Sequence, residues 1–223
     1  MERDKVERLR EQLPAVKSCY YFNTGTNGPI CTASAEAMKR EAEKEYLEGR
    51  YLPFIAELYE EMDATRELIA NFIGAETDEI ALTHSATEGM NVILWGITWQ
   101  PGDEIITTNR EHIASLAPIS LVSSRFNLTV KYLDVAYGEE YDEDRFVERF
   151  TKAISRRSRL LVVSHVSFST GLTFPLKRLA EICHQNDMYI LVDGAQGAGA
   201  TPLDVHDFQI DFYSLAVRKW VLG

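Results

Sequence analysis

The chain has 223 residues, of which 45% are hydrophobic, and its formal net charge is −11 at pH 7. This hydrophobic fraction supports a sizeable core and argues against disorder. The negative charge disfavours nucleic acid or an anionic membrane as a partner, and no apolar run approaches the roughly 20 residues that span a bilayer. The cysteines are odd in number and widely spaced, at Cys19, Cys31 and Cys183. We therefore expect a cytoplasmic protein without disulfides or a metal site.

The first thirty residues contain one expected helix and one expected loop. Residues 2–13 predict a short surface helix, because their apolar residues recur at near-helical spacing. The aromatic residues 20–22 are strand-like, and the Gly, Asn and Pro residues over 23–29 are typical of a loop.

Two helices are expected next. Thr32 or Ser34 can cap a charged helix that runs to about Gly49, and Pro53 opens a second helix that Gly74 ends. The second helix carries an apolar stripe that we expect to lie in the core: Ile55, Leu58, Met62, Ile69 and Phe72.

From residue 79 onward, strand and helix patterns alternate. The expected strands are 79–83, 103–107, 128–135, 159–166, 188–193 and 210–215. The expected helices begin near Met90 and cover 113–124, 143–154 and 175–186, and an acidic, exposed loop is expected over 136–142. Strands interleaved with helices predict an α/β fold with right-handed crossovers and a mostly parallel sheet.

The chain is organised around the strand 188–193. Its apolar residues run directly into Asp193 and Gly194, which is typical of a central strand covered on both faces. The carboxyl end of such a strand is where an open α/β sheet presents groups to a ligand. Alternatively, Asp193 only caps the following turn. Lys219 favours the first interpretation, because an acid after one strand and a lysine after another suggest pyridoxal phosphate (PLP) chemistry.

Several short motifs share the order they have in one known family. They are VDGAQ at 192–196, PLDV at 202–205, DFY at 211–213 and RKW at 218–220, with SATE at 85–88, EH at 111–112 and SHVS at 164–167 upstream. On these motifs the chain resembles the class V aminotransferases, which include cysteine desulfurases, cysteine lyases and isopenicillin-epimerase-like enzymes. The resemblance implies the three-layer large domain of a fold-type-I PLP enzyme over residues 31–223. Residues 1–30 would then form an N-terminal helix and a substrate-side loop.

The SATE segment predicts a phosphate site. It lies between an expected strand and an expected helix, where free backbone N–H groups and the helix dipole favour an anion. The alternative is a capping box from Ser85 to Glu88. The resemblance implies that the main chain of Ala86 and the hydroxyl of Thr87 hold the cofactor phosphate.

One histidine is expected to act on the cofactor. The resemblance places His112 flat against the pyridine ring, although a lone histidine is more often structural or solvated. We expect structural roles for the other four: His84, His165, His184 and His206.

Three residues carry the expected chemistry of the cofactor. PLP works as an electron sink only while its ring nitrogen is protonated, and a buried Asp193 would stabilise that charge. By resemblance, Gln196 hydrogen-bonds the ring's 3′-oxygen. Lys219 would form the internal Schiff base and shuttle protons at the substrate's α-carbon. The alternative, a surface lysine, is weakened by the apolar residues that follow it.

The remaining expected contacts are to phosphate and substrate. Arg218 replaces the histidine that desulfurases commonly carry at this position, and its guanidinium suits a phosphate. Thr26 and Asn27 lie in the early loop that the resemblance places near the substrate. The resemblance also implies a small amino-acid substrate and a homodimer with sites at the subunit interface.

Departures from the family pattern bear on the reaction. Phe168 stands where the desulfurases most like this chain carry asparagine, which favours the lyase and epimerase branches, and no cysteine occupies the desulfurase position. The sequence also ends shortly after Lys219, so we expect the amino-terminal part of a longer enzyme without its C-terminal domain. The expected activity is lyase, epimerase or aminotransferase chemistry on an amino acid. The alternatives are a cysteine desulfurase, or a truncated PLP-binding or assembly protein without full activity.

Overall fold

The computed structural model describes residues 2–135 and 141–223, so most of the acidic loop expected over 136–142 lies outside the described residues. The chain forms two compact units. Unit 1 comprises Met1–Phe72, Glu76–Leu82 and Val217–Gly223, and unit 2 comprises Ile73–Ala75 and Thr83–Ala216. The division predicted at residue 30 concerns functional roles and stays a prediction.

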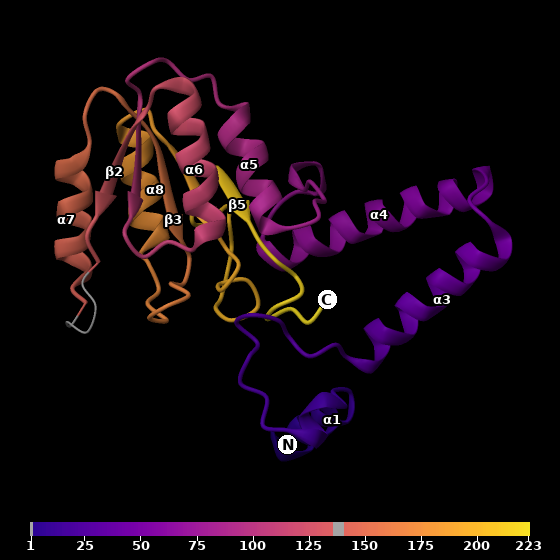
Figure 1. Ribbon diagram of the computed structural model, residues 1–223. Helices are drawn as coiled ribbons and strands as arrows, with labels where there is room; N and C mark the ends of the chain where they lie inside the picture. The colour runs from indigo at the N-terminus through magenta and orange to yellow at the C-terminus, as the bar shows by residue number, and fades with distance from the viewer. Residues whose placement is uncertain (1, 136–140) are drawn as a thin grey trace. The chain divides into compact units, whose positions relative to one another are not determined.

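Unit 2 is built on a parallel sheet of five strands in the order β2-β1-β3-β4-β5. The strands are β1 Glu104–Thr108, β2 Thr129–Leu133, β3 Ser158–Ser164, β4 Tyr189–Asp193 and β5 Phe212–Ser214. The helices are α5 Ala86–Gly96, α6 Ile113–Phe126, α7 Glu143–Ala153 and α8 Leu176–Gln185. Figure 1 shows this alternation of strands and helices in chain order. The predicted α/β fold with a parallel sheet is confirmed.

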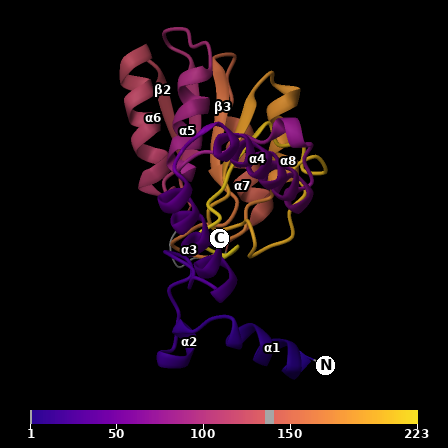
Figure 2. The same cartoon turned by 90° about the vertical axis from the view of Figure 1, so that its right-hand side faces the viewer.

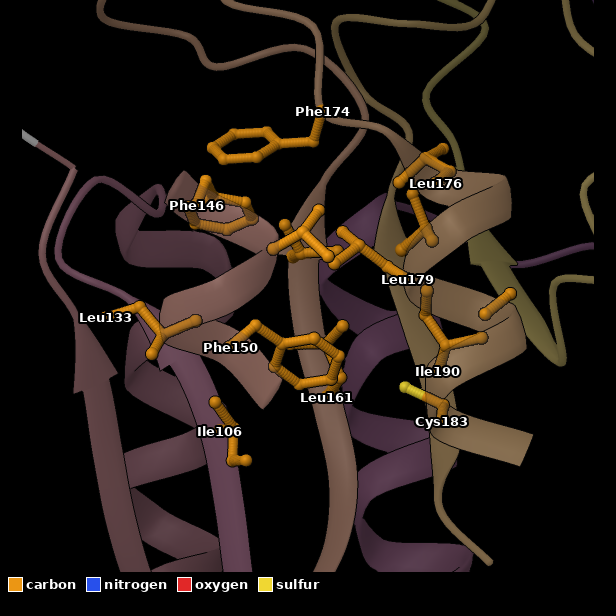
Figure 3. Packing of buried hydrophobic residues seen from close by; sticks show 14 of the residues in the cluster. Ile106, Leu133, Phe146, Phe150, Leu161, Phe174, Leu176, Leu179, Cys183 and Ile190 are labelled. Atoms are coloured by element: carbon orange, nitrogen blue, oxygen red, sulfur yellow. The ribbon is translucent and has the colours of Figure 1, made fainter. Parts of the chain in front are cut away.

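Helices cover both faces of the sheet. One hydrophobic cluster joins the sheet to α7 and α8, and Figure 3 shows Phe146 and Phe150 of α7 opposite Leu179 and Cys183 of α8. A second cluster joins the other face to α5 and α6. The four residues 160–163 of β3 are fully buried and alternate between the clusters. Both faces of a parallel sheet need such cover, so its strands contain continuous apolar runs.

Unit 1 is mostly helical and contains α1 Glu2–Glu11, α2 Ala15–Ser18, α3 Thr32–Glu48, the short 3-10 helix η1 Thr77–Glu79 and all but the last residue of α4 Leu52–Ile73. Figure 2 labels α1 to α4. Gly49 and Gly74 end the two long helices as predicted, at φ +78° and +73°. The cap of α3 is neither Thr32 nor Ser34. The thiol of Cys31 takes that place and accepts from the Ser34 N–H at 3.4 Å.

Three further expectations for the first part of the chain are wrong. Residues 20–22 and 79–83 form no strand, because extended chain becomes a strand only when it pairs with a neighbour, and the described residues offer none there. Residues 77–79 form η1 instead. The apolar stripe of α4 is exposed or half-buried rather than core. Periodicity identifies an apolar face, but burial requires a second surface packed on it, and both core clusters consist of unit 2 residues.

None of the helices among the described residues is long and apolar enough to cross a membrane. Within the same residues, no group of three or more His, Cys, Asp or Glu side chains could hold a metal ion.

Candidate functional site

A row of buried polar residues marks the carboxyl edge of the unit 2 sheet. Every strand except β2 ends in one: Thr108 in β1, Ser164 in β3, Asp193 in β4 and Ser214 in β5. Asp193 is paired in register with Ser164 on one side and Ser214 on the other. Apolar strands that all turn polar at their carboxyl ends form the edge where α/β sheets bind ligands.

Asp193 is held on both of its carboxylate oxygens. The side chain is only 5% exposed. Oδ1 accepts from the N–H of Ala195 at 3.1 Å, and Oδ2 accepts from the hydroxyl of Ser115 at 2.7 Å. The hydrogen bond from Ala195 is the turn cap expected as the alternative role of Asp193. The hydrogen bond from Ser115 of α6 is not part of a turn cap. Each oxygen can accept more than one hydrogen bond, so acceptor capacity remains for a ligand.

His112 lies at the start of α6. Its Nδ1 accepts from the Ala114 N–H at 3.1 Å and so caps the helix. Nδ1 is therefore the acceptor, and a neutral ring carries its proton on Nε2. The ring also meets Phe168 at right angles, with the centroids 4.9 Å apart. These two contacts fix the imidazole plane, while its expected stacking on a cofactor ring stays a prediction.

Glu111 is a buried acid that the sequence reasoning did not assign. Its Oε1 accepts from the hydroxyl of Thr108 at 2.7 Å, and its Oε2 accepts from the hydroxyl of Ser164 at 2.5 Å. Burial, helped by the nearby charge of Asp193, raises the pKa of Glu111 against the opposing effect of the two hydroxyls. The carboxyl group thereby joins the ends of β1 and β3. The EH motif at 111–112 was the sequence signal for this residue, but the motif gave it no role.

The first turn of α5 contains the predicted phosphate residues. Ser85 caps the helix by accepting from the Glu88 N–H at 3.2 Å. Glu88 accepts instead from the N–H of His84 at 2.6 Å, so the capping box expected as the alternative is only half formed. Ala86 is buried and Thr87 is half-buried at the next two positions, whose N–H groups have no acceptor within a helix. This turn suits an anion.

The turn after Asp193 is packed against two rings. His165 Nδ1 lies 2.9 Å from the hydroxyl of Tyr213, and burial lowers the pKa of His165 to about 4. A Cβ on Gly194 would lie less than 3.0 Å from the Tyr213 ring, and one on Gly197 less than 3.0 Å from the His165 ring. Gln196 is half-buried in the same turn. Glycine is required here so that the chain can approach the neutral histidine and the tyrosine.

Unit 1 brings together the other predicted site residues. The Arg218 guanidinium donates to the main-chain oxygen of Thr26 at 2.7 Å and to the side-chain oxygen of Asn27. The N–H of Gly28 donates to the main-chain oxygen of Arg218 at 2.8 Å, and a Cβ on Gly28 would lie less than 3.0 Å from the Lys219 oxygen. The early loop and the lysine segment, predicted on separate arguments, therefore pack together. Within the described residues, Arg218 binds this loop, and its phosphate contact stays a prediction.

Comparison with known proteins agrees with these motifs. The family model described as aminotransferase class-V matches residues 4–223. The chain belongs to the class V aminotransferases. The predicted family is therefore confirmed.

Individual class V relatives are longer than this chain. A probable cysteine desulfurase of Synechocystis is 34% identical over 161 residues, which are 70% of this chain and 37% of that protein. A probable cysteine desulfurase of Methanothermobacter thermautotrophicus is 27% identical over 98% of this chain and 54% of its own length. The chain thus spans about a third to a half of the curated relatives described here.

The solved structures include that of C-DES, a cystine C–S lyase whose reaction product is cysteine persulfide. A mutant of C-DES with glycine linked to its PLP cofactor superposes with a TM-score of 0.90 and 26% identity. The match covers 96% of this chain and 56% of that one. The class V fold extends over nearly all of this chain.

Proposed function

We propose that this class V protein is a PLP-dependent enzyme that acts on an amino acid. The observation that carries the proposal is the buried carboxylate of Asp193 at the carboxyl end of β4, with Ser115 and Ala195 each donating to one of its oxygens. When bound, PLP supplies an electron sink that stabilises negative charge at the substrate's α-carbon. Asp193 favours the protonated ring nitrogen on which that property depends.

The residues of unit 2 suit the ring and the phosphate. His112, held by Ala114 and Phe168, offers a fixed imidazole face to an aromatic ring. Gln196 follows Asp193 in the same turn and carries an amide that can bind the 3′-oxygen. The main chain of Ala86 and the hydroxyl of Thr87 bind the phosphate at the start of α5, where the helix dipole favours an anion. These groups together would orient the ring.

Lys219 would hold PLP through its ε-amino group and would move the proton at the substrate's α-carbon. The Arg218 guanidinium contacts Thr26 and Asn27 and would also bind the phosphate, because a guanidinium suits phosphate oxygens. Thr26 and Asn27 would then lie on the substrate side of the site. Residues 1–30 thus supply a helix and a substrate-side loop, and residues 31–223 the cofactor-binding domain.

We propose cleavage of a C–S bond in a cysteine-type substrate, because C-DES and the two curated relatives handle sulfur amino acids. A lyase is favoured over a desulfurase by Phe168, which stands where the desulfurases most like this chain carry asparagine. Epimerase or aminotransferase chemistry on the same site is the alternative outcome of an assay.

We further propose a homodimer located in the cytoplasm. The exposed apolar residues of α4, together with exposed Tyr46 and Leu47 of α3, are the kind of surface that proteins cover by association. The odd, unpaired cysteines suit a reducing compartment. Light scattering checks the oligomeric state, and a monomer at all concentrations would contradict the dimer.

The first experiment asks whether Lys219 binds PLP. Protein mixed with PLP should show a visible absorption band that borohydride reduction fixes onto the chain, and Lys219→Ala should lack it. Lys152→Ala is the control, because Lys152 is an exposed lysine paired with Glu148. A folded wild-type protein without a reducible band would contradict the proposal. A band without turnover of any amino acid would leave a PLP-binding or assembly protein.

A further inference from the structure

The first turn of α6 carries two groups directed at the candidate site. His112 caps the helix, and Ser115 follows three residues later, with its N–H donating to the His112 oxygen at 2.9 Å. Ser115 is fully buried. A single helical turn therefore presents both the imidazole that would contact the cofactor ring and a hydroxyl that contacts Asp193.

The hydrogen-bond acceptor of the Ser115 hydroxyl is unusual for a serine in a helix. Buried helical hydroxyls commonly bond a carbonyl one turn back, and Ser123 of the same helix does so, with 2.6 Å to the Ile119 oxygen. Ser115 instead donates to Asp193 Oδ2 at 2.7 Å, across 78 residues of chain. A hydrogen bond to a carboxylate is stronger than one to a neutral carbonyl, which accounts for this partner in a buried place.

The hydrogen bond from Ser115 helps to fix the orientation of the Asp193 carboxylate plane as well as its position. Ala195 holds Oδ1 from the turn of β4, and Ser115 holds Oδ2 from α6. With one oxygen held from each side, rotation of the carboxylate about its Cβ–Cγ bond is restrained. The remaining lone pairs then keep a constant direction, and a preorganised acceptor does not have to reorient when a ligand binds.

We infer that Ser115 is a positioning residue for PLP, which holds Asp193 in the orientation that stabilises the protonated ring nitrogen. The inference rests on the proposed function and extends it to a residue that touches neither cofactor nor substrate. Ser115 and His112 share one helical turn. A shift of that turn would therefore disturb the contact of His112 with the cofactor ring and, through Ser115, the contact of Asp193 with the ring nitrogen. Ser115 therefore acts on cofactor affinity and on the ring proton rather than on the reacting bond.

The test compares Ser115→Ala with Ser123→Ala, which removes a hydroxyl from the same helix without touching Asp193. The readouts are the dissociation constant of PLP and the pH dependence of its absorption band. Because hydrogen bonds to charged groups contribute more than neutral ones, Ser115→Ala should weaken PLP binding about tenfold. It should also shift the band's titration to lower pH, while Ser123→Ala should behave as wild type. If Ser115→Ala does not fold, Ser115→Cys keeps the size with a weaker donor and should show a smaller loss in the same direction.

A double-mutant cycle separates positioning from packing. In the Asp193→Ala background, Ser115→Ala should change PLP affinity less than about twofold, because its partner is already gone. An equal loss in both backgrounds would overturn the inference, as would a Ser115→Ala variant indistinguishable from Ser123→Ala. If either contradicting result is found while the wild-type protein shows a PLP absorption band that Lys219→Ala abolishes, the inference fails but the proposed function stands. A wild-type protein that binds no PLP would overturn the proposed function and the inference together.

Discussion

The hydroxyl of Ser214 donates to the main-chain oxygen of Ala86 at 2.8 Å, across 128 residues of chain. Ser214 ends β5 and Ala86 begins α5, so this buried bond ties the predicted phosphate-binding turn to the sheet edge that carries Asp193. Gly89 makes the approach possible, because a Cβ there would lie less than 3.0 Å from the Ser214 oxygen.

The first prediction concerns Gly89→Ala. The added methyl group displaces the Ser214 hydroxyl and breaks its bond to Ala86, which should cost about 1–3 kcal/mol of unfolding free energy. Urea denaturation measures that loss, and PLP affinity should fall with it. Gly96→Ala is the control in the same helix, where the new Cβ meets nothing within 4 Å and should be neutral or slightly stabilising. Equal behaviour of the two variants would show that the contact with Ser214 is unimportant.

The second prediction concerns the charge of Asp193. Asp193→Asn keeps the shape and can still accept from Ala195, but it removes the charge that stabilises a protonated ring nitrogen. A buried charge partner contributes a few kcal/mol, so turnover of the amino-acid substrate should fall about a hundredfold or more. Steady-state kinetics checks this against Asp144→Asn, a substitution of an exposed acid. Near-wild-type turnover would reduce Asp193 to a turn cap.

The third prediction is a pH dependence of stability due to His165. Burial lowers its pKa from 6.5 to about 4, so the unfolded chain binds more protons between these values. The free energy of unfolding should therefore fall as the pH drops from 6.5 to about 4, by roughly 3 kcal/mol from this group. His165→Asn cannot titrate, yet its side-chain oxygen can take the place of Nδ1 opposite Tyr213. Urea denaturation at several pH values should show a flatter slope for this variant, with His206→Asn as the exposed control. An unchanged slope would be inconsistent with a buried neutral His165.

The fourth prediction contrasts two acids of opposite pKa shift. Burial raises the pKa of Glu111 above 4.5, so its stabilising protonated form is lost as the pH rises. Glu111→Gln should therefore gain stability relative to wild type with increasing pH above about 4.5. Burial also opposes ionisation of Glu104, but hydrogen bonds from Lys131, Ser155 and Ser158 outweigh it and lower its pKa. Glu104→Gln should be less stable at neutral pH and approach wild type as the pH falls below 4.5. Unfolding curves from pH 3 to 8 that showed the same trend for both variants would contradict one of these assignments.

Local pattern was enough to predict most of unit 2. The apolar runs that end at Thr108, Ser164 and Asp193 are strands because both faces of a parallel sheet are buried, and this requirement is visible in each segment alone. The helices between them, the glycine turn after Asp193 and the order of the class V motifs are equally local. Family and fold class could therefore be predicted before any coordinates.

The errors fell where burial depends on a partner. Residues 79–83 have the composition of a strand, and α4 has an apolar face, but neither property supplies the neighbour that would pair or cover it. Periodicity reports what a segment can bury, whereas burial itself is a property of two surfaces.

The sequence by itself determined the class V family, the parallel α/β sheet and the place of Asp193 at a strand end, because each depends on residues close together in the chain. Only the tertiary structure decided which distant residues form hydrogen bonds at the candidate site. Ser115 reaches Asp193 across 78 residues, Ser164 reaches Glu111 across 53, and Arg218 reaches Thr26 across 192. Ser115 and Ser164 carry no sequence signal for such distant partners, because a serine has the same local propensity whether it faces water, a helix carbonyl or a buried carboxylate.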